Sequence, residues 1–454
     1  MIRRLSPLPA LFARVALLCA CAITLSAPIA QSATPRVHAI RNARIVTAPG
    51  RVIPRGNVVM RDGLIVAVGA DAPIPADARI WEGDSLTVYA GLIDALVMPP
   101  APAPGFGGGP FGGGRPGGAP PAAETPRGPV HELAAVRAEV RVVESLPMES
   151  SQAEALRAAG FTTVQYAPRQ GVVRGQSALV NLGNGSSNTN VVRADVAQVI
   201  GMSPGRGNVY PASLMGSIAV LRQTFLDAKW YRDARAAAAR RAGTERVAEN
   251  LAWDALQPVI SGQQPVVMIA DDMLQVLQAA KIAREAGVSA TLVGAGDEYK
   301  RITQVAATGR PMIVPVAFPD APEVSDEANA LEVRTEELRH WQAAPGNPAV
   351  LAKAGVTFAL TSNGMKDVKS FRGNVAKAIA RGFSEDAALA AVTTTPARML
   401  GAEGKLGVIA PGAVANLTVT RGALFAENSK VREVWVDGAR IEVAKDETSP
   451  KGEW

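Results

Sequence analysis

The chain has 454 residues, of which 48% are hydrophobic and 19% are charged. This composition is typical of a globular protein and excludes a mainly disordered one, and the length allows one large barrel with a smaller domain. The formal net charge of +6 includes three arginines within the first 33 residues, so the remainder carries only +3. No block of Lys and Arg is interleaved with aromatic residues, so nucleic acid is not expected as a partner.

The N-terminal segment has the features of a secretory signal peptide. Arg3 and Arg4 form a basic start, an apolar run covers residues 15–27, and small residues follow at 30–32. The apolar run is shorter than the roughly 20 residues that span a bilayer. We therefore expect residues 1–33 to be removed, which leaves no stable membrane span and predicts a periplasmic or secreted protein.

Two alternatives to cleavage are a retained membrane anchor and lipidation at Cys21. The only cysteines of the chain, Cys19 and Cys21, both lie in this segment. After cleavage the protein would have no disulfide, no thiolate metal ligand and no cysteine nucleophile.

Both ends of the remaining chain are rich in short β-strand patterns. Runs of β-forming residues at 43–47, 57–60 and 64–68 precede residue 88, and similar runs at 415–420 and 431–436 lie near the C-terminus. Turn signals at 61–63 and 437–438 separate neighbouring runs as in β-hairpins. The pattern indicates one small β domain, a sandwich built from both termini.

The middle of the chain alternates between apolar strand patterns and amphipathic helix patterns, which is typical of parallel sheets buried on both faces. The expected strands are 88–98, 161–166, 265–270, 290–294, 312–316 and 356–361. The expected helices are 132–146, 151–159, 216–242, 273–286, 326–343 and 384–392. With β-rich termini on both sides, this alternation favours an α/β fold with a (β/α)8 barrel over an open doubly wound sheet.

A Gly- and Pro-rich segment, residues 99–121, directly follows the first expected barrel strand. Its composition predicts a flexible loop at the end of the barrel where active sites lie, either a mobile cover or a tolerated insertion. The predicted division of the chain is a signal peptide (1–33), the two parts of the β domain (34–87 and 403–454) and the barrel (88–402).

The motif Gly91-Leu92-Ile93-Asp94 resembles the first barrel strand of the amidohydrolase superfamily, where Pro-Gly-Leu-Ile-Asp precedes a His-x-His pair. Residues 387–401 resemble the helix after the last barrel strand of that family, and residues 406–417 resemble the return into its small sheet. Within the superfamily the chain is most similar to the imidazolonepropionase-like amidohydrolases. The resemblance implies the same barrel and composite β domain, and by analogy a hydrolase of carbon–nitrogen bonds other than peptide bonds.

The resemblance also implies a binuclear metal site, and the positions of its ligands are substituted in this chain. Leu96 and Met98 stand for the first-strand histidines, Ile269 for the fifth-strand histidine, and Asn363 for the eighth-strand aspartate that serves as ligand and base. The sixth-strand histidine would fall near Gly294, and the fourth-strand lysine has no aligned counterpart. Leucine and isoleucine have no lone pair, a thioether suits soft copper(I), and an amide cannot act as a carboxylate base. We therefore expect no metal and no other cofactor.

The three histidines of the chain are His38, His131 and His340, and none has the spacing of a metal site. We expect them to be separate surface or packing residues.

Other polar residues could build a site that needs no metal. Asp271 and Asp272 follow the fifth expected strand and could act as an acid/base pair, although Asp272 could equally cap the helix beginning at Met273. Arg169 and Arg174, expected in one loop after a strand, could hold an anion or be solvated. Ser362 lies beside Asn363 but has no identifiable histidine partner, so a serine nucleophile is not supported.

The leading hypothesis is a degenerate amidohydrolase-fold protein that has lost its metal site and binds a small-molecule ligand or a partner. It would act as a homo-oligomer or in a complex with a metal-competent amidohydrolase. The alternatives are an active hydrolase of cyclic amides that uses a non-standard site including Asp271 or Asp272, and a structural component of the cell envelope.

Overall fold

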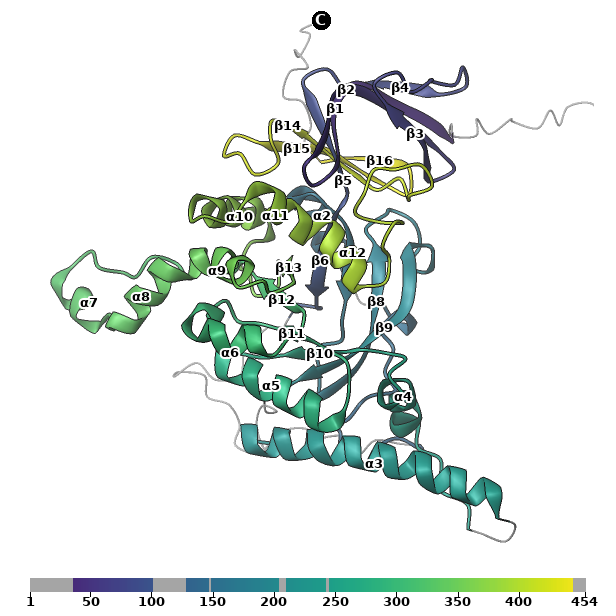
Figure 1. Ribbon diagram of the computed structural model, residues 1–454, viewed down its shortest axis with the longest axis vertical. Helices are drawn as coiled ribbons and strands as arrows, with labels where there is room; N and C mark the ends of the chain where they lie inside the picture. The colour runs from purple at the N-terminus through teal and green to yellow at the C-terminus, as the bar shows by residue number, and fades with distance from the viewer. Residues whose placement is uncertain (1–35, 101–127, 147, 204–209, 242–244, 444–454) are drawn as a thin grey trace, which may run out of the picture.

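The computed structural model describes residues 36–100, 128–146, 148–203, 210–241 and 245–443. Its strands form two eight-stranded sheets, one small and mixed and the other curled into a barrel (Figure 1). The predicted signal peptide and nearly all of the Gly/Pro-rich segment 99–121 lie outside the described residues. No helix in the described part of the chain is long and apolar enough to cross a membrane.

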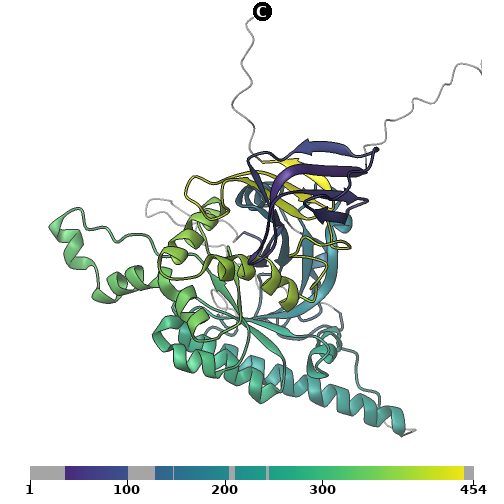
Figure 2. The ribbon, with the colours of Figure 1, turned by 45° about the horizontal axis from the view of Figure 1, so that its top comes forward.

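The small sheet combines strands from both ends of the chain, with the order β16-β15-β14-β5-β1-β2-β3 and β4 beside β1. Figure 2 shows its purple N-terminal strands beside its yellow C-terminal strands. The joint between the two parts is the antiparallel pairing of β5 with β14, in which Leu417 lies opposite Ala90. The strands are β1 (Val37–Ala48), β2 (Arg51–Arg61), β3 (Leu64–Gly69), β4 (Arg79–Glu82), β5 (Leu86–Ala90), β14 (Leu417–Arg421), β15 (Lys430–Val436) and β16 (Ala439–Glu442).

The barrel sheet follows the chain in order from β6 to β13, which confirms the predicted fold class. Its strands are β6 (Leu92–Val97), β7 (Phe161–Tyr166), β8 (Val173–Asn181), β9 (Val191–Gly201), β10 (Val266–Ile269), β11 (Ala290–Val293), β12 (Met312–Pro315) and β13 (Phe358–Thr361). β8 departs from the regular pattern because it pairs antiparallel with both β7 and β9. Its first residues therefore lie at the end of the barrel where the parallel strands finish.

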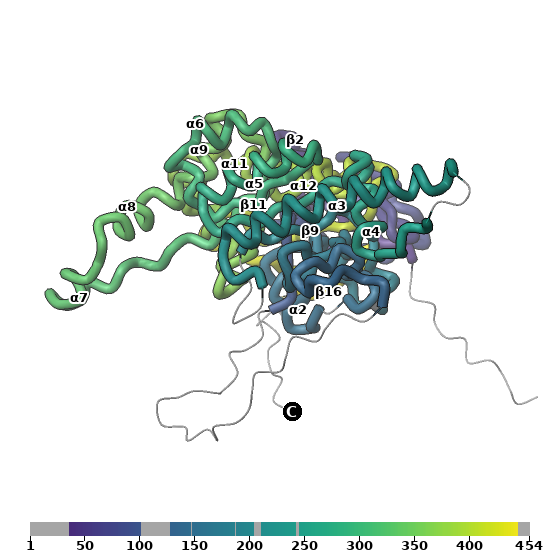
Figure 3. Tube along the Cα trace, turned by 90° about the horizontal axis from the view of Figure 1, so that it is seen from below, coloured from purple at the N-terminus to yellow at the C-terminus, as the bar shows by residue number. Residues whose placement is uncertain are grey.

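Helices cover the outside of the barrel (Figures 1 and 2). The α-helices are α2 (Ser150–Ala159), α3 (Leu214–Arg240), α4 (Leu251–Ile260), α5 (Met273–Ala286), α6 (Ile302–Ala307), α7 (Glu327–Glu332), α8 (Thr335–Ala343), α9 (Asn347–Lys353), α10 (Phe371–Ala380), α11 (Glu385–Val392) and α12 (Thr394–Met399). The 3-10 helices are η2 (Val142–Glu144), η3 (Ser187–Asn190), η4 (Glu298–Arg301), η5 (Ala344–Gly346) and η6 (Val368–Ser370). Figure 3 shows that α7 and α8 project from the body of the molecule.

The strand predicted over residues 88–98 is two strands that belong to different sheets. Residues up to Ala90 pair with β14 in the small sheet, and the barrel begins at Leu92. The chain passes between the sheets at Gly91, where a Cβ atom would overlap the buried side chain of Thr162. Only glycine fits this close approach, so the motif marks the joint between the two sheets.

Two helix predictions are wrong in part. Residues 132–146 form turns and the short η2, because their backbone serves as a partner for the start of β8. The Arg137 N–H donates to the Val173 carbonyl (2.8 Å), and the Gln176 N–H donates to the Val140 carbonyl (2.7 Å). The helix predicted over 326–343 is divided into α7 and α8 at Arg334, which has an extended backbone conformation. The backbone N–H of Arg334 donates to the Glu337 carboxylate at the start of α8.

Candidate functional site at the barrel mouth

Asp94 closes the barrel between its first and last strands, which form no backbone ladder with each other. The carboxylate is fully buried and accepts hydrogen bonds from the Thr361 hydroxyl (2.7 Å), the Ser362 hydroxyl (2.6 Å), the Ser362 N–H (3.0 Å) and the Leu96 N–H (3.1 Å). Burial raises its pKa, and the bonds from Ser362 and Thr361 act in the opposite direction. The Asp of the Gly-Leu-Ile-Asp motif thus ties β6 to β13.

The residues at three expected ligand positions fill the barrel interior. Leu96, Met98 and Ile269 belong to one buried apolar cluster with residues from other strands, and Leu96 is completely inaccessible to solvent. Packed aliphatic side chains are what the interior of such a barrel normally contains. These positions therefore have the character of a packed core.

Arg174 is the cationic group beside this apolar cluster. It lies at the start of β8, and the reversal of this strand brings it to the mouth, although the sequence predicted a loop position. Its guanidinium lies over Gly201, where a Cβ would overlap it, and its Nη1 is 3.4 Å from the Met98 sulfur. Gly201 ends the fourth strand around the barrel, so no lysine stands at the end of that strand.

Arg174 has no carboxylate within ion-pair distance in the described part of the chain. Its Nε donates to the Gly171 carbonyl (3.2 Å). Burial lowers the pKa of the guanidinium to about 10, the nearby positive charge of Arg169 adds to this effect, and the carboxylate of Asp271 opposes it. The group remains protonated at neutral pH, so the mouth carries a buried positive charge.

Arg169 lies in the loop between β7 and β8, as predicted, and its Nε donates to the Pro99 carbonyl (2.6 Å) at the exit of the first barrel strand. It is partly exposed, and burial lowers its pKa. The structure thus brings the two predicted anion-binding arginines to the same end of the barrel.

The two aspartates after β10 have separate environments. Asp272 is the N-cap of α5, and its side chain accepts from the Gln275 N–H (2.8 Å), which is the capping role weighed from the sequence. Asp271 is exposed and accepts from the Ser203 hydroxyl (2.5 Å). They do not form a shared acid/base pair, because one of the two carboxylates is committed to the helix.

Asn363 is partly buried beyond β13, where its backbone N–H donates to the Thr361 hydroxyl (3.0 Å). Ser362 is occupied by Asp94, and no histidine contacts it among the described residues. Near Gly294, where a sixth-strand histidine was expected, the space is taken by Glu298, a buried carboxylate whose pKa burial raises. It accepts from the Ala295 N–H (2.8 Å) and from Asn347 (2.5 Å).

The three histidines lie apart from one another, on separate elements. His38 packs against Trp81 in the small sheet, His131 contacts Trp253, and the Nδ1 of His340 on α8 is 3.0 Å from the Tyr299 hydroxyl. In the described ranges no three His, Cys, Asp or Glu side chains are grouped so that they could hold a metal ion.

The closing role of Asp94 and the approach of Arg174 to Gly201 were not predicted from the sequence. The first had a visible signal in the motif itself, because an aspartate inside an apolar strand requires buried partners. The second had none, because it depends on the reversed direction of β8.

Comparisons with known proteins agree with this fold. Residues 334–445 match the model of the amidohydrolase family. An amidohydrolase from Thermotoga maritima has a similar structure with a TM-score of 0.70 and 22% identity, covering 89% of this chain and 99% of that one. A putative prolidase from Bifidobacterium longum superposes with a TM-score of 0.51 and 13% identity, covering 90% and 95% of the two chains.

A search of curated proteins gives no match. The chain therefore has the fold of the amidohydrolase from Thermotoga maritima, and its residues 334–445 match the amidohydrolase family.

Proposed function

We propose that this protein is a degenerate member of the superfamily, a pseudoenzyme that binds a small carboxylate-bearing molecule at the barrel mouth without a metal. The observation that carries the proposal is that Leu96, Met98 and Ile269 all lie in one buried apolar cluster of the barrel interior. Two arginines beside the cluster supply the charge that such a ligand would meet.

The residues present do not fit the binuclear metal site that the fold implies. A hydrolytic zinc ion needs about three N, O or S ligands, and two of the positions carry aliphatic side chains. The thioether of Met98 already lies against the Arg174 guanidinium. A divalent cation at this place would also meet the charge of Arg174 in a region of low dielectric constant, which adds a repulsive cost.

The same charge favours an anion. Arg174 and Arg169 are close enough for the charge of Arg169 to lower the pKa of Arg174, and neither forms an ion pair within the described residues. A guanidinium binds a carboxylate through two parallel N–H donors, which gives direction as well as attraction. A ligand carboxylate at the mouth would offset this positive charge further than the nearby carboxylate of Asp271 does.

We place the protein in the periplasm or outside the cell on the basic start and apolar run of its first 33 residues. It would act as a homo-oligomer or beside a metal-competent relative. The capping role of Asp272 weighs against an active cyclic-amide hydrolase that uses the Asp271–Asp272 pair.

Metal analysis of the protein purified without chelators tests the loss of the metal site. We expect far less than one zinc, manganese or iron ion per chain, including after incubation with excess metal and desalting. One or two tightly retained ions per chain would refute the proposal. Turnover of cyclic amides that Asp271→Ala abolishes would favour the hydrolase.

Calorimetric titration with benzoate and N-acetylglycine, and with their uncharged amides, tests the anion site. We expect the carboxylates to bind and the amides not to bind. Arg174→Gln should weaken binding about 10- to 100-fold, the equivalent of one hydrogen-bonded charge. Gly201→Ala should act similarly because its Cβ displaces the guanidinium, whereas Arg137→Gln, which alters a surface arginine, should not. Equal affinity for carboxylates and amides would refute the proposed ligand class.

A further inference from the structure

A cavity lies outside the barrel, between α3, α4 and residues 130–133. Its volume is about 590 Å³, which suits a small molecule. The lining residues are Val130, His131, Glu132, Leu133, Tyr210, Ala219, Val220, Gln223, Thr224, Asp227, Trp230, Asn250 and Trp253. None of these residues belongs to the barrel mouth.

The walls of this cavity are unusually aromatic. Tyr210, Trp230 and Trp253 line it, although the whole chain has only 6 tryptophans and 5 tyrosines. The rings of Trp230 and Trp253 lie 6.2 Å apart at 78°, and the ring of His131 meets Trp253 edge-on at 6.0 Å. Trp230 and Tyr210 are each 56% exposed, so they offer faces that no described part of the protein covers.

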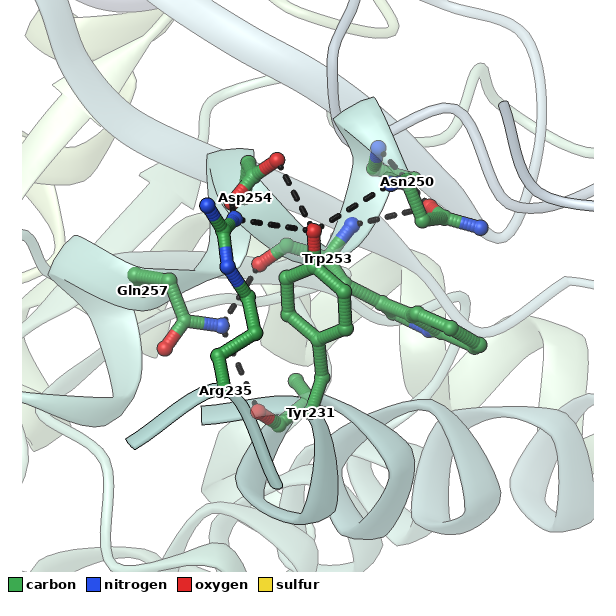
Figure 4. A network of polar contacts seen from close by, with 8 residues as sticks. Tyr231, Arg235, Asn250, Trp253, Asp254 and Gln257 are labelled. Atoms are coloured by element: carbon green, nitrogen blue, oxygen red, sulfur yellow. Dashed lines mark hydrogen bonds and ion pairs between the residues drawn. The ribbon is translucent and has the colours of Figure 1, made fainter. Parts of the chain in front are cut away.

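A polar network behind Trp253 holds this wall in place (Figure 4). The Tyr231 ring packs against Trp253 at 5.3 Å, and its hydroxyl donates to Asp254 (3.1 Å). The same hydroxyl accepts from Arg235 (2.9 Å). The Asn250 side chain accepts from the backbone N–H of Trp253 (3.1 Å). Trp253 is therefore held in position and need not be ordered by a ligand.

The charges around the cavity are negative. Glu132 and Asp227 line it, and within the described residues no lysine or arginine lines it and neither carboxylate forms an ion pair. Burial lowers the pKa of His131, so this ring is neutral at pH 7 and does not offset them. The Asp227 carboxylate accepts from Gln223 (2.7 Å), and the two carboxylates of the cavity would attract cations.

The polar atoms of the cavity point to a ligand as well. His131 is 6% exposed, its Nδ1 accepts from the Leu133 N–H (3.0 Å), and its Nε2 has no partner in the described part of the chain. The indole Nε1 of Trp253 is buried, also with no described partner. A buried donor such as the Trp253 indole N–H is normally satisfied by protein, water or ligand, and its partner would be a hydrogen-bond acceptor of the ligand, such as a hydroxyl group.

We infer that this cavity binds a small organic cation, an ammonium or quaternary ammonium group held between the faces of Trp230, Trp253 and Tyr210 and beside Asp227 and Glu132. Aromatic faces attract such cations through their quadrupoles, and nearby carboxylates supply the opposite charge. The site is independent of the barrel mouth, and its ligand has the opposite charge.

Calorimetric titration of the full chain with choline tests this inference, with the uncharged isostere 3,3-dimethylbutan-1-ol as the comparison. We expect choline to bind at least about 10-fold more tightly than the isostere, because both have the same shape but only choline is a cation. Trp230→Leu should weaken choline binding about 2- to 30-fold. Trp341→Leu, which removes a comparably exposed tryptophan (43%) on α8, is the matched control and should have no effect.

Asp227→Asn should weaken choline binding while leaving the fold intact, because this partly buried carboxylate is not part of an ion pair in the described structure. Arg174→Gln should leave choline binding unchanged, which separates this site from the barrel mouth. Equal binding of choline and its isostere, equal effects of Trp230→Leu and Trp341→Leu, or no binding of choline at millimolar concentration would each overturn the inference.

Discussion

Replacing Asp94 by asparagine should destabilise the protein strongly, because this carboxylate is the hydrogen-bonded joint between β6 and β13. Each of its oxygens accepts two hydrogen bonds, and two of the four donors are backbone N–H groups that cannot rotate away. The substitution keeps the shape of the side chain but exchanges one acceptor oxygen for a donor. The barrel would then lose acceptors where its first and last strands meet.

The magnitude follows from the partners that remain in Asp94→Asn. The amide oxygen of the new side chain, placed where Oδ1 lies now, would keep the bonds from the Thr361 hydroxyl and the Leu96 N–H. Its NH₂ group would face the Ser362 N–H, and the Ser362 hydroxyl could rotate to accept from it. One buried backbone donor left unpaired costs about 1–3 kcal/mol, and the remaining bonds weaken when the acceptor loses its charge. We therefore expect a loss of about 2–4 kcal/mol in the free energy of unfolding.

Urea unfolding followed by circular dichroism, with linear extrapolation to water, measures this change. The control is Asp77→Asn, which breaks a solvent-exposed ion pair with Arg61 and should have a much smaller effect. Similar effects of the two substitutions would show that Asp94 does not hold the barrel closed. Asp94→Ala leaves two backbone donors unpaired and should be more destabilising than Asp94→Asn.

Three further predictions follow. Leu96→Ala should cost about 2–5 kcal/mol as a large-to-small change in the core, whereas Leu331→Ala, which is 83% exposed, should stay within about 0.5 kcal/mol in the same urea assay. Gly91→Ala should lower the thermal midpoint by forcing Thr162 aside, and an unchanged midpoint would contradict the tight joint. Burial lowers the pKa of His131, so the unfolded chain takes up a proton first as the pH falls below about 6.5. Stability should therefore fall from that pH toward the lower folded-state pKa, and less steeply in His131→Asn; parallel pH profiles of the two proteins would refute this.

The sequence alone determined the two sheets and most of their elements. Continuous apolar runs separated by helix patterns indicate a parallel sheet covered on both faces, and the β-rich termini favoured a barrel over an open sheet. Local signals fixed several boundaries, such as Asp272 and Gly287 at the two ends of α5. The aliphatic residues at Leu96 and Ile269 also indicated a packed interior, because they have no chemistry other than burial.

The tertiary structure decided what local patterns could not express. The helix period of residues 132–146 was overridden because β8 needed backbone partners, and Gly91 divided one apolar run between two sheets. The direction of β8 placed Arg174 over Gly201 at the mouth of the barrel. Strand direction is set by which neighbours are available for pairing, which is a long-range property. The same residue on a parallel strand would lie at the opposite end of the barrel, so the charge at the mouth is a consequence of topology.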